Sequence, residues 1–207
     1  MTWPRITVVT PSYNQGNYLE QTVRSVLDQD YPNLEYMVVD GGSTDASREI
    51  IERYADRLAW WVSEPDRGQS HAINKGWERA DGEILAWLNS DDYYLPNALT
   101  RAATAFREQP RAVVVYGDCR FIQEPSRQTR VYHVGPRDLV SLLTKGTLSQ
   151  PAVFVRASAL ALTGLLDETL HFSMDYDLWL RLAECGETAY IGGEPLAVFR
   201  EHSAAKG

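Results

Sequence analysis

The first 110 residues of this 207-residue chain alternate short apolar runs with amphipathic helix patterns. The runs fall at residues 6–10, 35–40, 58–62 and 84–88, and each is followed by apolar residues at helical spacing. Short apolar runs rich in β-branched residues are typical of buried strands. Parallel strands need a helical crossover between them, so repeated strand–helix units predict a mostly parallel, doubly wound α/β sheet.

The second half of the chain, residues 111–207, lacks this alternation. Short strands are predicted at 113–117, 120–123, 130–134, 151–155 and 197–199, with a short helix at 138–145. A longer helix is predicted to begin near Asp175 and to end at Gly186, because a glycine often follows the last helical residue. We see no linker, repeat or low-complexity tract. We therefore expect residues 1–207 to form a single domain whose second half has mixed strand directions and covers the open side of a cleft.

Charge and hydropathy limit the partners of the chain. Its formal net charge is −8 and its basic residues form no tract, which argues against nucleic acid as a main partner. No apolar run approaches the roughly 18–20 residues that span a bilayer, and the first residues do not have a signal-peptide pattern. Cys119 and Cys185 have no metal-site or disulfide spacing. We expect a cytoplasmic protein with no transmembrane segment, and peripheral contact with the inner face of the membrane stays open.

Polar side chains follow each of the four strand patterns. They include Tyr13 after the first, Asp40 at the end of the second, Asp66 after the third and Asp91 after the fourth. The carboxyl ends of parallel strands meet at one edge of a sheet, where ligands bind in open α/β folds. We therefore expect these four side chains to line one cleft.

The acids after the fourth strand, Asp91 and Asp92, have two interpretations. Neighbouring carboxylates repel each other unless a cation binds, and oxygen ligands at a strand end suit Mg²⁺ or Mn²⁺ holding a phosphorylated substrate. The alternative is a turn that caps a helix beginning near Pro96. Two other candidate residues also have structural alternatives, since Asp40 suits a turn cap and Asp175 suits a helix N-terminus.

Known phosphate-binding loops are absent from the sequence. A dinucleotide site needs Gly-x-Gly-x-x-Gly after a strand, but the first strand meets Pro-Ser-Tyr-Asn at residues 11–14. No Gly-Lys-Ser/Thr loop is present either. Diphosphate binding would therefore have to come from a metal ion and scattered donors, which fits the acids after the fourth strand.

Six segments, taken in order, resemble the motifs of family 2 glycosyltransferases, which have a GT-A fold. They are residues 10–14, 39–45, 64–76, 88–92, 174–181 and 199–202. The resemblance implies an inverting enzyme of cell-envelope polysaccharide biosynthesis. Such an enzyme moves a sugar from a nucleoside-diphosphate sugar to a hydroxyl of a carbohydrate or lipid-linked acceptor. Residues 1–110 would be its nucleotide-binding half, and residues 111–207 would bind the acceptor and carry the catalytic base.

The resemblance also implies how the nucleotide is held. Asp40 would bind the base, with Pro11 and Tyr13 packed against it. A carboxylate there accepts the imide N–H of uracil or thymine, so UDP or dTDP donors are expected. Further nucleotide-sugar contacts are expected from Thr10, Asp66, Gly68, Asn74 and Ser90.

The metal and the base are implied in the same way. Asp91, with His202 as an additional ligand, would hold Mn²⁺ or Mg²⁺ on the diphosphate, and Asp175 would take the proton of the acceptor hydroxyl. The sequence departs from the family pattern at two positions. Asn89 stands where many members have an acid, and Met174 precedes Asp175 where glutamate is common.

Two other classes of protein stay open at this point. One is a sugar-nucleotide-binding module without transfer activity, although Asp91 and Asp175 are both present. The other is a nucleotidyltransferase on a related fold, although the loop at residues 10–17 lacks the glycine-rich, basic pattern usual for that class.

Overall fold

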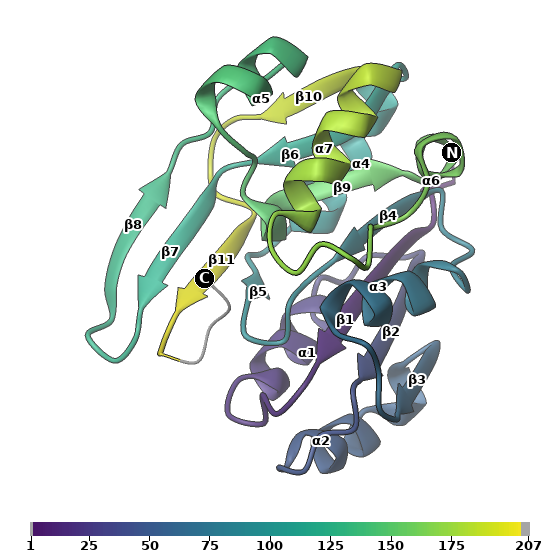
Figure 1. The fold of residues 1–207 in the computed structure, drawn as a ribbon, viewed down its shortest axis with the longest axis vertical. Coiled ribbons are helices and arrows are strands. Elements are labelled where there is room, and N and C mark those ends of the chain that lie inside the picture. Colours follow the sequence, from purple (N-terminus) through teal and green to yellow (C-terminus); the bar gives the residue numbers. More distant parts are fainter. Residues whose placement is uncertain (1, 204–207) are drawn as a thin grey trace.

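The computed structural model describes residues 2–203, which form two β-sheets (Figure 1). The larger sheet has the order β10-β6-β9-β4-β1-β2-β3. Its strands are β1 (Ile6–Ser12), β2 (Leu34–Asp40), β3 (Trp60–Ser63), β4 (Ile84–Trp87), β6 (Ala112–Gly117), β9 (Val153–Arg156) and β10 (Glu187–Ile191). The smaller sheet, on the left of Figure 1, has the order β5-β11-β7-β8. Its strands are β5 (Tyr93–Tyr94), β7 (Cys119–Gln123), β8 (Gln128–Tyr132) and β11 (Ala197–Glu201).

The strand directions confirm a mostly parallel sheet. β1 pairs in parallel with both β2 and β4, and β3 continues this order beyond β2. β9 is antiparallel to both β4 and β6, so β6 runs in the same direction as β4. The seven-stranded sheet therefore has a single reversed strand, and this strand comes from the half of the chain expected to be mixed.

Helices cover both faces of the larger sheet and bury a core on each. The α-helices are α1 (Leu19–Leu27), α2 (Ser47–Arg53), α3 (Gln69–Trp77), α4 (Ala98–Glu108), α5 (Leu139–Lys145), α6 (Ala157–Thr163) and α7 (Met174–Cys185). Two 3-10 turns, η1 (Ala55–Arg57) and η2 (Gln150–Ala152), complete the set in the described residues. One core contains buried side chains of α1, α2 and α4, and the other contains those of α3, α5, α6 and α7. None of these helices is long and apolar enough to cross a membrane.

The observed elements differ from the expected ones in a few places. β1 continues through Pro11 to Ser12, whereas the sequence predicts that the strand ends at Thr10. Ser12 accepts a bond from Gly41 on the β2 side, so the amide position of Pro11 faces the β4 side. The pairing of β1 with β4 ends at Val9 and Trp87, before Pro11. Pro11 therefore has no strand partner on that side, and its missing N–H costs no hydrogen bond of the sheet. The short elements β5, α6 and β10 are not predicted from the sequence, because each is too short for a clear period.

Close packing fixes where α3 lies. Gly76 faces β1, and a Cβ atom at this position would lie 2.6 Å from Val9 Cγ2. The helix axis can therefore approach the sheet more closely than a helix with a larger residue at that position. This contact holds the N-terminal end of α3, with Gln69, at the same edge as the carboxyl ends of β1 and β4.

Candidate functional site

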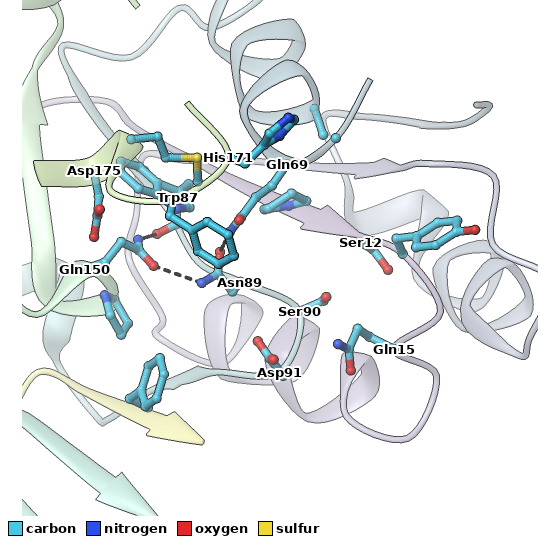
Figure 2. A pocket seen from close by; sticks show the side chains of 18 of the residues that line it. Ser12, Gln15, Gln69, Trp87, Asn89, Ser90, Asp91, Gln150, His171 and Asp175 are labelled. Carbon is cyan, nitrogen blue, oxygen red and sulfur yellow. Dashed lines mark hydrogen bonds between the residues drawn. The ribbon is translucent and has the colours of Figure 1, made fainter. Parts of the chain in front are cut away.

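A cavity of about 960 Å³ lies at the carboxyl ends of β1, β2, β3 and β4 (Figure 2). Loops after these strands form one wall, through residues 11–13, 15, 41, 65, 66, 68, 69 and 89–91. The second half of the chain forms the other wall, through residues 147–151 and 171–175, with Phe121, Tyr132 and Phe199 from the smaller sheet. Segments that are more than 100 residues apart in the chain thus enclose one space.

Most of the residues predicted for the site line this cavity. They are Pro11, Tyr13, Asp66, Gly68, Ser90, Asp91 and Asp175. Thr10, Asp40, Asn74 and His202 are not in the lining. His202 contacts the lining residue Asp91, while the other three support the loops around the cavity.

Asp40 is buried, with 0% exposed surface, and its carboxylate is used within the loop that follows β2. It accepts hydrogen bonds from the backbone N–H groups of Gly42 and Ser43 and from the hydroxyls of Ser43 and Ser63. A carboxylate with four such donors has little capacity left for a ligand. The placement therefore differs from the expected base contact and corresponds to the turn-capping alternative.

Thr10 and Asn74 have supporting positions as well. The hydroxyl of Thr10 is 2.9 Å from that of Tyr36 in the core between β1 and β2. The Asn74 side chain donates to Leu166 O at 2.9 Å and accepts from Leu166 N at 3.1 Å. These bonds tie α3 to the segment before α7, so Asn74 shapes the cavity from behind.

Asp66 is the carboxylate that reaches the cavity beside the loop after β2. A Cβ atom on Gly41 would lie 2.8 Å from Asp66 Oδ2, so this carboxylate occupies the space next to a residue without a side chain. The Gly68 N–H donates to Asp66 Oδ1 at 2.7 Å, which fixes the carboxylate orientation. Asp66 shares the cavity lining with Pro11 and with Tyr13, whose side chain is exposed.

Asp91 and His202 form a close pair. His202 Nε2 lies 3.0 Å from Asp91 Oδ2, and the His202 ring packs on Tyr18 with a centroid distance of 4.5 Å. Within the described part of the chain, no group of three or more His, Cys, Asp or Glu residues is arranged to hold a metal ion. One carboxylate with an adjacent imidazole fits a Mg²⁺ or Mn²⁺ ion that takes its remaining ligands from substrate phosphates and water.

Asp92 has a different role from its neighbour. Burial of Asp92, and next the charge of Asp91, raise the pKa of the Asp92 carboxyl well above its ordinary value. Its Oδ1 accepts a bond from the backbone N–H of Arg200 at 2.9 Å. Asp92 therefore joins the loop after β4 to β11, while Asp91 faces the cavity.

Three amide side chains form a hydrogen-bonded chain across the cavity floor (Figure 2). Gln150 Nε2 donates to Trp87 O at 2.9 Å, Asn89 Nδ2 donates to Gln150 Oε1 at 3.1 Å, and Gln69 Nε2 donates to Asn89 Oδ1 at 2.7 Å. A backbone carbonyl can only accept, so the carbonyl of Trp87 sets the direction of every amide in this amide chain. The side-chain oxygen of Asn89 thus accepts from Gln69, and Asp91 is the carboxylate of this loop that faces the cavity.

Asp175 lies in the first turn of α7 and lines the cavity from the side opposite the first-half loops. Its Oδ1 accepts from Tyr176 N at 2.8 Å. Met174 is buried, and its sulfur accepts a hydrogen bond from the Ser70 hydroxyl. Asp177 is outside the lining and is bound by Arg181 at 2.7 Å. Asp175 is therefore the carboxylate that α7 presents to the cavity.

Sequence reasoning missed several residues that line the cavity. Gln69 and Gln150 are the clearest cases, since isolated glutamines carry no motif and Gln150 belongs to the second half of the chain. Trp87 is buried and stacked on Trp179 at 5.4 Å, and it also borders the cavity. Because these residues meet only after folding, no local pattern could have identified them as a group.

Comparison with known proteins gives a consistent result. The model of the family "Glycosyl transferase family 2" matches residues 7–164. An uncharacterized glycosyltransferase of Rickettsia typhi is 30% identical over 97% of this chain and 65% of its own length. TuaG of Bacillus subtilis, whose name assigns it to teichuronic acid biosynthesis, is 32% identical over 95% of this chain and 79% of its own length. This chain therefore spans about two thirds of the Rickettsia relative.

Solved structures match the fold. Staphylococcus aureus TarS 1-349, determined in complex with UDP, has a TM-score of 0.79 at 21% identity, over 95% of this chain and 60% of the TarS chain. The mannosyltransferase PcManGT of Pyrobaculum calidifontis, determined with GDP-Man and Mn²⁺, has a TM-score of 0.72 at 23% identity, over 97% of this chain and 57% of its own. Both matches support a GT-A arrangement of the sheet and helices.

We predict that Asn89→Asp lowers the free energy of unfolding by about 1–3 kcal/mol at neutral pH. The new carboxylate cannot donate to Gln150 Oε1, so two oxygens would face each other where an N–H now bridges them. Protonation restores a donor, so the new carboxyl should have a raised pKa in the folded state. Such a group stabilises the folded state at low pH, and this contribution is lost as pH rises.

Urea unfolding at pH 7 and at about pH 4.5 measures this effect, which should be smaller at the lower pH. Asn17→Asp is the matched control, because Asn17 is exposed and the same change there should stay within about 0.5 kcal/mol. Equal losses of unfolding free energy for the two variants, or a loss that does not depend on pH, would contradict the hydrogen-bond directions assigned to the amide chain.

Proposed function

The chain belongs to glycosyltransferase family 2, and on this basis we propose that it transfers a sugar from a nucleoside-diphosphate sugar to an acceptor hydroxyl with inversion, using a divalent metal. One observation carries the proposal. Asp66, Asp91 and Asp175 line the cavity, whereas no lysine or arginine of residues 2–203 does. A diphosphate can enter such a cavity only if a bound cation offsets its charge, and the Asp91 side chain supplies the position for that cation.

The metal stabilises charge on the departing diphosphate when it is bound. Asp91 would be its main protein ligand, and His202 would either add a ligand or hold the Asp91 carboxylate by its contact at 3.0 Å. Mn²⁺ and Mg²⁺ both suit this oxygen-rich set. PcManGT, which has a similar fold, was determined with Mn²⁺, in agreement with this choice.

Asp175 is proposed as the general base. It would accept the proton of the acceptor hydroxyl while the hydroxyl oxygen attacks the anomeric carbon from the side opposite the diphosphate. Asp91 and Asp175 come from opposite walls of the cavity, so a sugar held between them has its leaving group and its attacking group on opposite sides. This geometry supports inversion of configuration.

For the nucleotide we propose that Asp66 accepts the imide N–H of uracil or thymine, with Tyr13 and Pro11 against the base. Asp40, expected from the sequence to make this contact, would instead hold the loop that positions Asp66. TarS was determined with UDP and with UDP-GlcNAc, which are ligands of the class proposed here.

The acceptor is proposed to be a carbohydrate or lipid-linked glycan in polysaccharide biosynthesis for the cell envelope, in line with the name of TuaG. The two walls of the cavity fit a division into a nucleotide-binding half, residues 1–110, and an acceptor-binding half, residues 111–207. We place the reaction in the cytoplasm, where nucleotide-sugars are donors, with peripheral contact at the membrane.

A screen of nucleotide-sugars for Mn²⁺-dependent binding and slow hydrolysis tests the function, since it needs no known acceptor. Donor hydrolysis, inverted at the anomeric carbon, is the expected result. Binding without turnover on any donor or acceptor would favour a sugar-nucleotide-binding module instead. Release of pyrophosphate from a nucleoside triphosphate would favour a nucleotidyltransferase.

We predict that Asp175→Asn lowers turnover by about 10²–10⁴-fold and leaves donor affinity nearly unchanged. Asparagine keeps the size of the side chain but cannot accept the proton. Asp177→Asn is the matched control, because Asp177 is two residues further along α7 and bound to Arg181. Near-normal turnover in the Asp175 variant, or equal losses in the two, would remove Asp175 from the role of base.

We predict that Asp91→Ala weakens Mn²⁺-dependent binding of the donor, because it removes the main protein ligand of the metal. Titration of donor by calorimetry at several Mn²⁺ concentrations measures this loss. Asp56→Ala removes the same charge from an exposed turn and should have no effect. Donor binding and transfer that persist in excess chelator would show that the reaction needs no metal.

We predict that UDP or dTDP binds at least about tenfold more tightly than ADP or CDP in Mn²⁺. Asp66→Asn should narrow this gap in a folded protein, because an amide no longer offers only acceptors to the base. Asp40→Asn should lower stability and leave the ratio between bases nearly unchanged. If Asp40→Asn narrows the affinity ratio and Asp66→Asn does not, Asp40 makes the contact with the nucleobase. Equal affinities for all four diphosphates would mean that neither carboxylate contacts the nucleobase.

A further inference from the structure

The amide chain of Gln69, Asn89 and Gln150 is placed where the transferred sugar has to lie. In Figure 2, Asn89 and Gln150 lie between the side chains of Asp175 and Asp91. In the proposed reaction, the diphosphate is at the Asp91 end and the acceptor hydroxyl is at Asp175. The anomeric carbon is bonded to one and attacked by the other, so the sugar ring lies over this part of the floor.

The charged groups around this floor are almost all negative. The lining contains Asp66, Asp91 and Asp175, and its one basic side chain among residues 2–203, His171, is exposed at the rim. The cations of the neighbouring loop and helix are engaged elsewhere. Arg67 is bound to Glu168 at 2.7 Å, and Lys75 is bound to Glu64 at 2.6 Å.

A bound divalent metal leaves the net charge around this floor negative. The diphosphate of a nucleotide-sugar carries two negative charges and Asp91 carries a third, so one M²⁺ leaves the group with a net negative charge. A carboxylate on the sugar would then lie between this group and Asp175, and no lysine or arginine of residues 2–203 lines the cavity to pair with it. Burying an unpaired charge is costly, and a like charge nearby adds to that cost.

The amide chain offers hydrogen bonds without charge. The carbonyl of Trp87 orients Gln150, and Gln150 orients Asn89, so each of these two amides uses one N–H within the chain. An amide nitrogen has two N–H groups, so Gln150 keeps a second donor for an oxygen of the ligand, whereas the Asn89 side chain also bonds to Asp92. Neutral hydroxyls suit such donors, because they can donate and accept in turn.

We propose that the sugar subsite selects electrically neutral glycosyl groups, such as hexoses or N-acetylhexosamines, and rejects uronates, and that the amide chain forms the recognition surface. The proposal rests on the proposed function and deepens it by naming the substrate class. The matched pair UDP-glucose and UDP-glucuronate differs only in the group at C6. UDP-glucuronate binds at least tenfold more weakly than UDP-glucose in Mn²⁺.

Competitive calorimetry at pH 8, where histidine side chains are generally neutral, measures both ligands against the same UDP reference. GDP-mannose and GDP-mannuronate replace the pair if the protein binds guanine nucleotides. If no nucleotide-sugar binds while the protein is folded, the proposed function itself fails. If both ligands bind and the uronate is less than tenfold weaker, the proposed function stands and the selection of neutral sugars is overturned.

Two variants at one position separate charge from shape. Gln150→Lys adds a cation to the floor and narrows the affinity ratio between the two donors to about threefold or less. Gln150→Met removes the amide but adds no charge, and it leaves the ratio at tenfold or more. Each ratio compares two ligands on the same folded variant, so a general loss of stability does not alter it. A ratio that is unchanged in Gln150→Lys overturns the electrostatic basis of the selection.

Discussion

Parallel pairing of β1 with both β2 and β4 is the constraint on which the site depends. Each strand in this set returns through a helix, so all their carboxyl ends meet at one edge and every following loop reaches the same space. Gly76 has no side chain, so α3 packs close to β1 at this position, which holds the helix against the sheet. The first-half wall of the cavity is therefore a direct consequence of strand direction, and it needs no special feature in the loops themselves.

The second wall depends on contacts between the two halves of the chain. β9 inserts between β4 and β6 in the opposite direction, which brings η2 and Gln150 to the end of β4. Asp92 joins the loop after β4 to β11 through the backbone of Arg200, and His202 comes directly after β11. Asn74 connects α3 to the segment before α7. These polar contacts place Asp175 opposite Asp91, so the chemistry proposed for the pair depends on bonds that cross the whole sequence.

Carboxylates in this protein divide into structural and accessible groups according to their hydrogen-bond partners. Asp40 and Asp92 are buried; Asp40 accepts from two backbone N–H groups and Asp92 from one, and these bonds fix the loops. Asp66, Asp91 and Asp175 also accept bonds from the chain, yet they keep a face toward the cavity. The result is a cavity whose lining carboxylates give it negative charge, and the proposals for the metal and for the sugar both follow from that charge.

The sequence by itself determined the fold class, the order of the main elements and the family, because periodicity and motif order are properties of neighbouring residues. It also located Asp91, Asp175 and Tyr13 near the carboxyl ends of strands or at the start of a helix, and the cavity contains all three. Only the tertiary structure shows that Asp40 is enclosed by its own loop while Asp66 lines the cavity, because the direction of each carboxylate depends on Ser43, Ser63 and Gly41 rather than on its own motif. The amide chain was likewise beyond the sequence, since Gln69, Asn89 and Gln150 acquire a common orientation only when the carbonyl of Trp87 meets Gln150 across 63 positions of the chain.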